Sequence, residues 1–270
     1  MEKVCVLVDF SPASKVAIKY ACGFAAQADA VLQILHVSDP DNKNDLESVR
    51  KSLQEFVNDT EGCSHPHEII VEEGKFMERI PDLLANHGSE LVIIATHGIK
   101  GIFHTMQGPE VLRLIQSVPI ASLVIQEQTP REFKGFDHIL FPMSPHKNIQ
   151  TKIDQTAAVA KAFGSKVLIF VLTPVSGELD ARLQSNLQQA EQAFEQQGIE
   201  YEEIYETSKV YGVGYAKQAL EFAESRQVDL FAIMAHASEE HSYFGNVERS
   251  GFILNDHGVP VLCCNSPSDQ

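Results

Sequence analysis

The sequence predicts an α/β protein of two tandem domains, each with a parallel sheet of five strands flanked by helices. Strand-like apolar runs alternate with amphipathic segments along all 270 residues, which is the pattern of βαβ units. The second half repeats the first: residues 229–236, DLFAIMAH, match residues 90–97, ELVIIATH, at an offset of 229 minus 90, or 139. A chain of this length also suits two domains of about 130 residues each.

The first half is expected to contain five strands with helices between them. Each strand is a run rich in Val, Ile and Leu, at residues 3–9, 31–37, 67–73, 90–95 and 121–126. In the segment 14–28, Val16, Tyr20 and Phe24 are spaced four apart, so they share one face of a helix. The resulting order βαβαβαβαβ favours a parallel sheet.

The second half has the same series of elements. Its strands are expected at residues 138–143, 166–172, 201–206, 229–235 and 260–264. A long amphipathic segment, 148–164, follows the first of them. The stretch 127–137 between the halves is polar, contains Pro and Gly, and lacks periodicity, so it is interpreted as a linker. The predicted domains are 1–128 and 136–267.

Charge and composition exclude several classes of partner. The chain has 21 Lys and Arg against 37 Asp and Glu, a net charge of -16 that is spread evenly over both halves. Such a surface repels phosphate backbones and anionic lipids, so no nucleic-acid or membrane partner is expected. No apolar stretch approaches the roughly 20 residues of a membrane span, and the first residues do not form a signal peptide. The sequence therefore predicts a cytoplasmic protein.

Cysteine and histidine positions give no sign of a metal centre or of catalysis. The five cysteines, an odd number, are interpreted as reduced thiols of the core: Cys5, Cys22, Cys63, Cys263 and Cys264. The histidines lack partner ligands at metal spacing, so no metal is expected. No set of nucleophile, base and orienting group can be assembled, so no catalytic residue is assigned and the protein is not expected to be an enzyme.

A glycine-containing loop is the best candidate for ligand binding. Residues 95–112, ATHGIKGIFHTMQGPEVL, follow a strand and lead into a helix, and glycines there let backbone N–H groups converge on a phosphate at the helix N-terminus. In an open parallel sheet, ligands lie beyond the carboxyl ends of the strands. Asp9 follows the first strand and Val37 ends the second, so both are expected beside this loop.

VLVDFSPAS, ILHVSD and the glycine loop resemble the universal stress protein family in its tandem form, over Glu2 to about Asn265. The resemblance implies two Rossmann-like domains, of the adenine nucleotide alpha hydrolase-like type, with strand order 3-2-1-4-5. It also implies ATP as the ligand. The family's pattern is Gly, two residues, Gly, nine residues, then Gly with Ser or Thr. The corresponding residues here are Ala95, Gly98, Gly108 and Pro109.

The resemblance assigns six residues to the nucleotide site: Asp9, Val37, Ala95, Gly98, Gly108 and Pro109. Asp9 would contact the base end of the nucleotide, although capping of the next helix by Asp9 or Ser11 is an alternative. Ala95 adds a Cβ, and Pro109 removes a hydroxyl and an N–H. In the second domain Ser144 stands in place of Asp9, Ala237 replaces the central glycine, and two glutamates follow it. ATP is therefore expected in the first domain only.

Two interpretations of function remain open, and a third is weaker. The first is a stress-response regulatory module that binds ATP, and the second is a protein-interaction scaffold without nucleotide. The third, a hydrolase or nucleotidyl-transferring relative, lacks its motifs. By resemblance, residues 119–125 and 259–264 are expected to pair antiparallel as an internal pseudo-dimer, and a homodimer of whole chains is left open.

Overall fold

The computed structural model describes residues 1–42, 45–96, 108–126, 128–130, 132–174, 177–208, 215–236 and 246–265. Within these ranges the first half contains β1 (Lys3–Leu7), α1 (Pro12–Ala28), β2 (Val31–Ser38), a 3-10 helix (Pro40–Asn42), α2 (Leu46–Asn58), β3 (His67–Glu73), α3 (Phe76–Asn86), β4 (Leu91–Thr96), α4 (Gly108–Ser117) and β5 (Ala121–Gln126). The strands begin where the apolar runs of the sequence begin, or one residue later. β1 ends two residues early, because Asp9 already belongs to the turn into α1.

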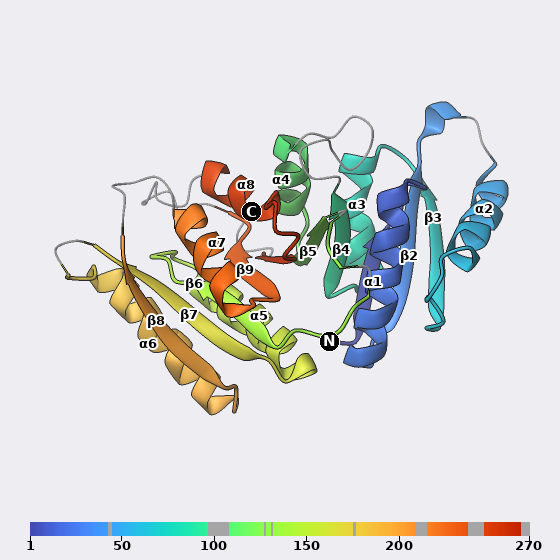
Figure 1. Ribbon diagram of the computed structural model, residues 1–270. Helices are drawn as coiled ribbons and strands as arrows, with labels where there is room; N and C mark the ends of the chain where they lie inside the picture. The colour runs from blue at the N-terminus through green and yellow to red at the C-terminus, as the bar shows by residue number, and fades with distance from the viewer. Residues whose placement is uncertain are drawn as a thin grey trace.

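The second half repeats this order without the 3-10 helix. Its elements are β6 (His138–Pro142), α5 (Ile149–Phe163), β7 (Lys166–Thr173), α6 (Ala181–Gln196), β8 (Tyr201–Thr207), α7 (Tyr215–Arg226), β9 (Leu230–Met234), α8 (Asn246–Ile253) and β10 (Val261–Cys264). Figure 1 shows the two halves side by side, with the blue to green elements of the first half beside the yellow to red elements of the second.

All ten strands form a single sheet of order β3-β2-β1-β4-β5-β10-β9-β6-β7-β8. Neighbouring strands are parallel, except that β5 and β10 are antiparallel. Within each half the order is 3-2-1-4-5, so the predicted fold class is confirmed.

Side chains at helix starts explain why several helices begin where they do. Ser11 accepts a hydrogen bond from Ser14 N at the start of α1, and Pro12 occupies the first helical position. Asp45 and Asp180 cap α2 and α6 in the same way. At the other end of α1, Asp29 adopts a left-handed conformation with φ of 53°, and Gly164 does so after α5.

Two apolar layers hold the helices on the sheet, one on each face. The first layer contains buried residues of α1, α2, α5 and α6, and the second contains those of α3, α4, α7 and α8. Successive strand residues alternate between the layers, so Cys263 belongs to one and Cys264 to the other. Each layer runs across both halves, so the halves share their core.

The antiparallel contact of β5 and β10 joins the halves at the centre of the sheet. Leu123 lies opposite Leu262 and Val124 opposite Val261, which is the pairing expected from the sequence. All residues of both strands are buried. Because an antiparallel pair relates its strands by a local two-fold axis, the halves are arranged as a pseudo-dimer within one chain.

The segment between the halves is anchored, although its sequence is interpreted as a polar linker. Phe133 lies 4.9 Å from the Tyr20 ring on α1 and 5.3 Å from the Phe163 ring on α5, measured between centroids. A Cβ at Gly23 would lie 2.7 Å from Phe133 Cβ, so only glycine leaves room for this ring. Phe136 is buried beside it. The aromatic cluster therefore clamps the connecting segment to both halves.

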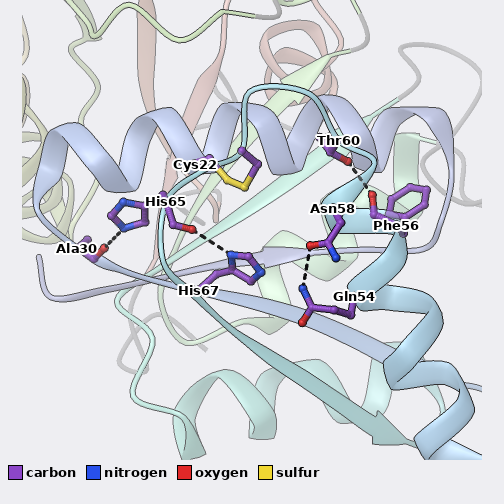
Figure 2. Close-up of a disulfide and its surroundings, with 9 residues drawn as sticks. Cys22, Ala30, Gln54, Phe56, Asn58, Thr60, His65 and His67 are labelled. Atoms are coloured by element: carbon purple, nitrogen blue, oxygen red, sulfur yellow. Dashed lines mark hydrogen bonds between the residues drawn. A yellow bond between two sulfur atoms is a disulfide. The ribbon is translucent and has the colours of Figure 1, made fainter.

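The prediction of five reduced cysteines is wrong for two of them. Cys22 on α1 and Cys63 in the turn after α2 form a disulfide (Figure 2). They are 41 residues apart in sequence, and the turn reaches α1 because β3 pairs with β2, next to the strand that α1 covers. Cys5, Cys263 and Cys264 are buried thiols, as expected.

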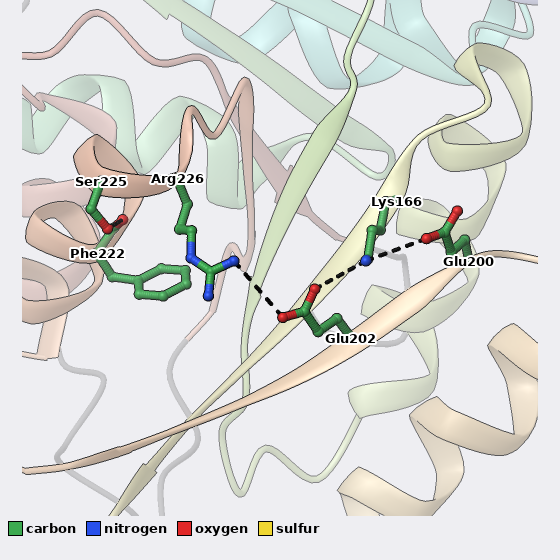
Figure 3. A network of polar contacts seen from close by, with 6 residues as sticks. All are labelled: Lys166, Glu200, Glu202, Phe222, Ser225 and Arg226. Carbon is green, nitrogen blue, oxygen red and sulfur yellow. Dashed lines mark hydrogen bonds and ion pairs between the residues drawn. The ribbon is translucent and has the colours of Figure 1, made fainter.

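The outer strand β8 presents charged side chains, which discourage pairing with another chain. Lys166 Nζ lies 3.0 Å from Glu202 Oε2 and 3.3 Å from Glu200 Oε1, and Arg226 Nη1 lies 3.9 Å from Glu202 Oε1 (Figure 3). The hydrogen bonds that Lys166 donates to Glu202 and Glu200 raise the pKa of Lys166. These exposed pairs fix charges along the edge, and we assign them little stability.

Replacing Leu123 and Leu262 together by lysine is expected to separate the halves. Each substitution places an ammonium group in a fully buried pair, at a cost of roughly 4 kcal/mol or more. Limited proteolysis should then cut the 127–137 segment faster, and small-angle scattering should show a larger radius of gyration. The exposed Val31→Lys variant serves as the control. A double variant as compact and as resistant as the parent would contradict the pairing.

Candidate functional site

The candidate crevice lies at the carboxyl ends of β1, β2 and β4, which are neighbours in the sheet. Leu7 of β1 is in register with Leu35 of β2, and this register continued by two residues brings Asp9 level with Val37. On the other side Val6 is in register with Ile93 of β4, two residues before Ala95. The sheet thus brings three of the six predicted residues to one edge: Asp9, Val37 and Ala95.

Asp9 is part of the turn that starts α1. Its carboxylate oxygen Oδ1 accepts hydrogen bonds from Ser11 N, at 3.0 Å, and from the Ser14 hydroxyl, while Asp9 N donates to Ser14 Oγ at 3.0 Å. The capping role considered from sequence is therefore observed, with Asp9 and Ser11 both engaged. Among the hydrogen bonds of the described residues, none uses Asp9 Oδ2. One half-buried carboxylate oxygen is thus left to accept a donor from a ligand.

An aromatic group that sequence reasoning missed supports this turn. Phe10 has a left-handed φ of 62°, which is uncommon for a bulky residue. Its ring packs edge-on against His36, at 4.8 Å, and Phe56 of α2, at 5.4 Å. His36 Nδ1 lies 2.8 Å from Val8 O, so this nitrogen carries the proton and donates it to the carbonyl. Burial lowers the pKa of His36, although the Val8 carbonyl and the charge of Asp9 oppose the shift.

The remaining predicted residues belong to the glycine loop and the helix after it. Gly108 and Pro109 are the first two residues of α4, so the loop does lead into a helix N-terminus. Gly98 lies outside the described residues, as do His97 and His104. Ala95 is buried and belongs to the apolar layer on the side of α1. The start of α4 is the positive end of a ten-residue helix, a feature that favours binding of a phosphate.

In the second half, a tyrosine covers the corresponding strand ends. Tyr215, the first residue of α7, has its hydroxyl 3.0 Å from Met143 O beyond β6 and 3.0 Å from Phe170 O in β7. Ser144, which stands in place of Asp9, is buried, and its carbonyl accepts from the Asn186 amide at 2.9 Å. Among the described residues, side chains of the second half therefore already bond to carbonyl groups at this end.

Two buried cations complete the difference between the halves. Lys152, 1% exposed, donates from Nζ to Pro142 O at 2.6 Å and lies 3.8 Å from the centre of the Phe141 ring. Arg249, 2% exposed, donates to Met234 O at 3.1 Å and to His236 O at 2.7 Å. Burial lowers the pKa of Lys152 to about 7 and that of Arg249 to about 10.

The sequence gives a partial signal for these cations. At the repeat offset of 135, Lys152 corresponds to Ala17, which is buried in the first half. At the offset of 137 that aligns Gly108 with Gly245, Arg249 corresponds to the buried Leu112. A comparison of the repeats would therefore have placed both charges at core positions. The first half has a carboxylate at its crevice, whereas the second has an ammonium and a guanidinium beneath its strand ends.

Within the described residues, no group of three or more His, Cys, Asp or Glu is placed to hold a metal ion. No helix there is both long and apolar enough to cross a membrane.

Comparisons with known proteins identify relatives of this chain. The model of the universal stress protein family matches residues 1–126. A universal stress protein from Archaeoglobus fulgidus is similar in structure, with 15% identity and a TM-score of 0.70 over 99% of this chain and 97% of that one. A putative universal stress protein from Pseudomonas aeruginosa has 14% identity and a TM-score of 0.60 over 100% and 95%. No curated protein matches the chain. At these identities the similarity concerns the fold, and it spans both halves.

Replacing Lys152 by methionine is expected to remove a pH dependence of stability. Because burial lowers the pKa from 10.5 to about 7, the unfolded chain binds one proton more than the native protein above pH 7. The free energy of unfolding contributed by this group therefore rises with pH, by about 2 kcal/mol between pH 7 and 9. Urea titrations at several pH values give the free energy of unfolding, which should rise more steeply between pH 7 and 9 for the parent than for Lys152→Met. The exposed Lys161→Met variant on the same helix should follow the parent, and parallel curves for Lys152→Met would contradict the assignment.

Proposed function

Because residues 1–126 of this chain belong to the universal stress protein family, and because the second half repeats their topology, we propose that the protein is a tandem universal stress protein that binds an adenine nucleotide in its first half. ATP is the first candidate ligand. The observation that supports this best is the contrast between the two sets of strand ends. Among the described residues, one set presents Asp9 with a carboxylate oxygen that makes no hydrogen bond, and in the other Tyr215 and two buried cations already bond to the carbonyl groups.

The chemistry of the first crevice suits the two ends of such a ligand. Asp9 Oδ2 accepts a hydrogen bond from an amino or hydroxyl group of the nucleoside, beside the apolar surface of Val37. The phosphates lie toward Gly108 at the start of α4, where the helix dipole favours negative charge. With a net charge of -16, the protein depends on this local geometry to hold an anion.

The second half acts as a structural partner in this proposal. Its carbonyl oxygens at the strand ends already accept from Lys152, Tyr215 and Arg249, so a nucleotide there would have to displace buried hydrogen bonds. Each such displacement leaves a polar group unpaired, at a cost of about 1–3 kcal/mol. The ligand is therefore assigned to the first half alone.

A scaffold without nucleotide is the second candidate function. Ala95 and Pro109 favour it, because they remove the first glycine of the family's pattern and a hydroxyl and N–H at the helix start. In either case we place the protein in the cytoplasm as a regulatory module and not as an enzyme. Steady phosphate release from ATP, abolished by Asp9→Ala, would overturn the non-enzymatic assignment.

Asp9→Asn is expected to weaken binding of ATP at least tenfold. The amide keeps the acceptor for Ser11 N but replaces the free carboxylate oxygen by a donor, and a hydrogen bond to a charged group contributes roughly 1.5–3 kcal/mol. Isothermal titration calorimetry measures the affinity, and native mass spectrometry shows any nucleotide that purifies with the protein and the number of chains. Ser144→Asn is the matched control in the second half. If Ser144→Asn loses the nucleotide and Asp9→Asn does not, the nucleotide binds in the second half and the assignment is wrong. If neither the parent nor the variants bind ATP, the scaffold without nucleotide is the function that remains.

Pro109→Ser is expected to tighten ATP binding about tenfold. Serine restores both a hydroxyl and a backbone N–H in the first turn of α4, where a phosphate would accept them. The same calorimetric titration tests this. Pro119→Ser, beyond the other end of α4, is the control and should leave the affinity unchanged. An affinity that does not change in Pro109→Ser would show that this turn does not limit binding.

A further inference from the structure

The disulfide links the middle of α1 to the turn between α2 and β3. Cys22 is 2% exposed and faces the apolar layer, whereas the Cys63 residue is half-buried in the turn between α2 and β3. Figure 2 shows the bond between the helix and this turn. The two residues therefore differ in exposure: Cys22 lies within the layer, whereas Cys63 packs against it and is partly exposed.

This difference suits thiol–disulfide exchange. A thiolate from outside reaches the partly exposed Cys63 more readily than Cys22. Cys22 leaves as a thiolate, and once it has taken up a proton its thiol packs in the layer as a small apolar group. The Cα atoms are 5.4 Å apart, a separation that accommodates either a bond or two thiols. Cys5 and Cys263 have no such access, and burial raises the pKa of each thiol.

A short chain of contacts connects Cys63 to the turn that holds Asp9. Cys63 N donates to Thr60 O at 3.4 Å, and the Thr60 hydroxyl donates to Phe56 O at 2.9 Å. The ring of Phe56 packs against Phe10, the residue with left-handed backbone directly after Asp9. The end of α2 is thus held against the crevice from one side by Phe56 and against α1 from the other by the disulfide.

We propose that Cys22 and Cys63 form a reversible redox pair whose reduction loosens α2 and the turn at Asp9. The reductant is a dithiol. Its first thiolate attacks Cys63 Sγ, the Cys22–Cys63 bond breaks, and Cys22 takes up a proton as a thiol. The second thiol of the reductant then attacks the mixed disulfide and releases Cys63 as a thiol. The protein gains two electrons and two protons, and the dithiol becomes a disulfide.

The segment keeps other anchors when the bond is reduced. His65 Nε2 lies 2.9 Å from Ala30 O, and β3 remains paired with β2 over seven residues. Reduction is therefore expected to loosen the end of α2 without unfolding the domain. The expected effect of reduction on nucleotide affinity rests on the proposed function. The expected loosening of α2 and of the turn at Asp9 does not.

Amide hydrogen exchange tests whether the Cys22–Cys63 bond is coupled to the turn at Asp9. It is measured on the full chain after oxidation with oxidised glutathione and after reduction with dithiothreitol. Reduction should speed exchange about tenfold in residues 56–66 and at least threefold in residues 9–14. Cys63→Ser should match the reduced parent under both conditions, and Cys5→Ala should respond as the parent does. Peptide mapping after alkylation shows the state of each cysteine.

Three results would overturn the inference: no Cys22–Cys63 bond in the oxidised parent, a bond that dithiothreitol leaves intact in the folded protein, or exchange in residues 9–14 that is the same in both states. Titration of the oxidised and of the reduced protein with ATP distinguishes a failure of the redox inference from a failure of the proposed function. If ATP binds, reduction should weaken it about tenfold, and an unchanged affinity would overturn the regulatory role. If ATP binds in neither state, the nucleotide proposal fails while the exchange data still decide the redox coupling.

Discussion

The antiparallel pairing of β5 with β10 is the contact on which the rest of the molecule depends. Without it, each half would end in an apolar edge strand with unpaired backbone groups. Two amides extend the pairing to the last helices. Gln126 donates to Ile253 O at the end of α8, and Asn265 donates to Val118 O just beyond α4. Each half therefore donates to carbonyl groups at the end of the other half's last helix, which have no partner within that helix.

This symmetry of backbone does not extend to the chemistry of the strand ends. A carbonyl at the end of a buried strand needs a donor, and two repeats of one fold meet this need in different ways. In the second half, side chains from the helices supply the donors, including the buried cations Lys152 and Arg249. In the first half, His36 donates a hydrogen bond to the Val8 carbonyl, and the charged carboxylate of Asp9 lies at the same edge of the sheet. Two copies of one domain can thus differ in the polar groups at their strand ends while both keep their sheet order.

The patterns of the sequence were sufficient for the strands and their parallel arrangement, because they reflect local burial. The central pairing was expected from the family resemblance alone. The patterns failed where partners lie far apart in the chain. The Cys22–Cys63 bond depends on where the turn after α2 meets α1. Phe133 is in a polar stretch without periodicity, and its contact is with Gly23 of a distant helix. The burial of Lys152 depends on a carbonyl of β6. For the site, the strand ends were predicted from topology, but the left-handed Phe10 has no signal in sequence.

The helix α1 connects the candidate crevice to the second half. Its first turn orients Asp9, its middle carries Cys22, and the next residue, Gly23, receives Phe133 of the connecting segment. Phe133 also contacts Phe163 on α5 of the second half. A helix of 17 residues moves largely as one stiff body, so a displacement at one of these contacts must be absorbed at the others. The second half therefore contacts, through α5 and the connecting segment, the helix whose first turn positions Asp9.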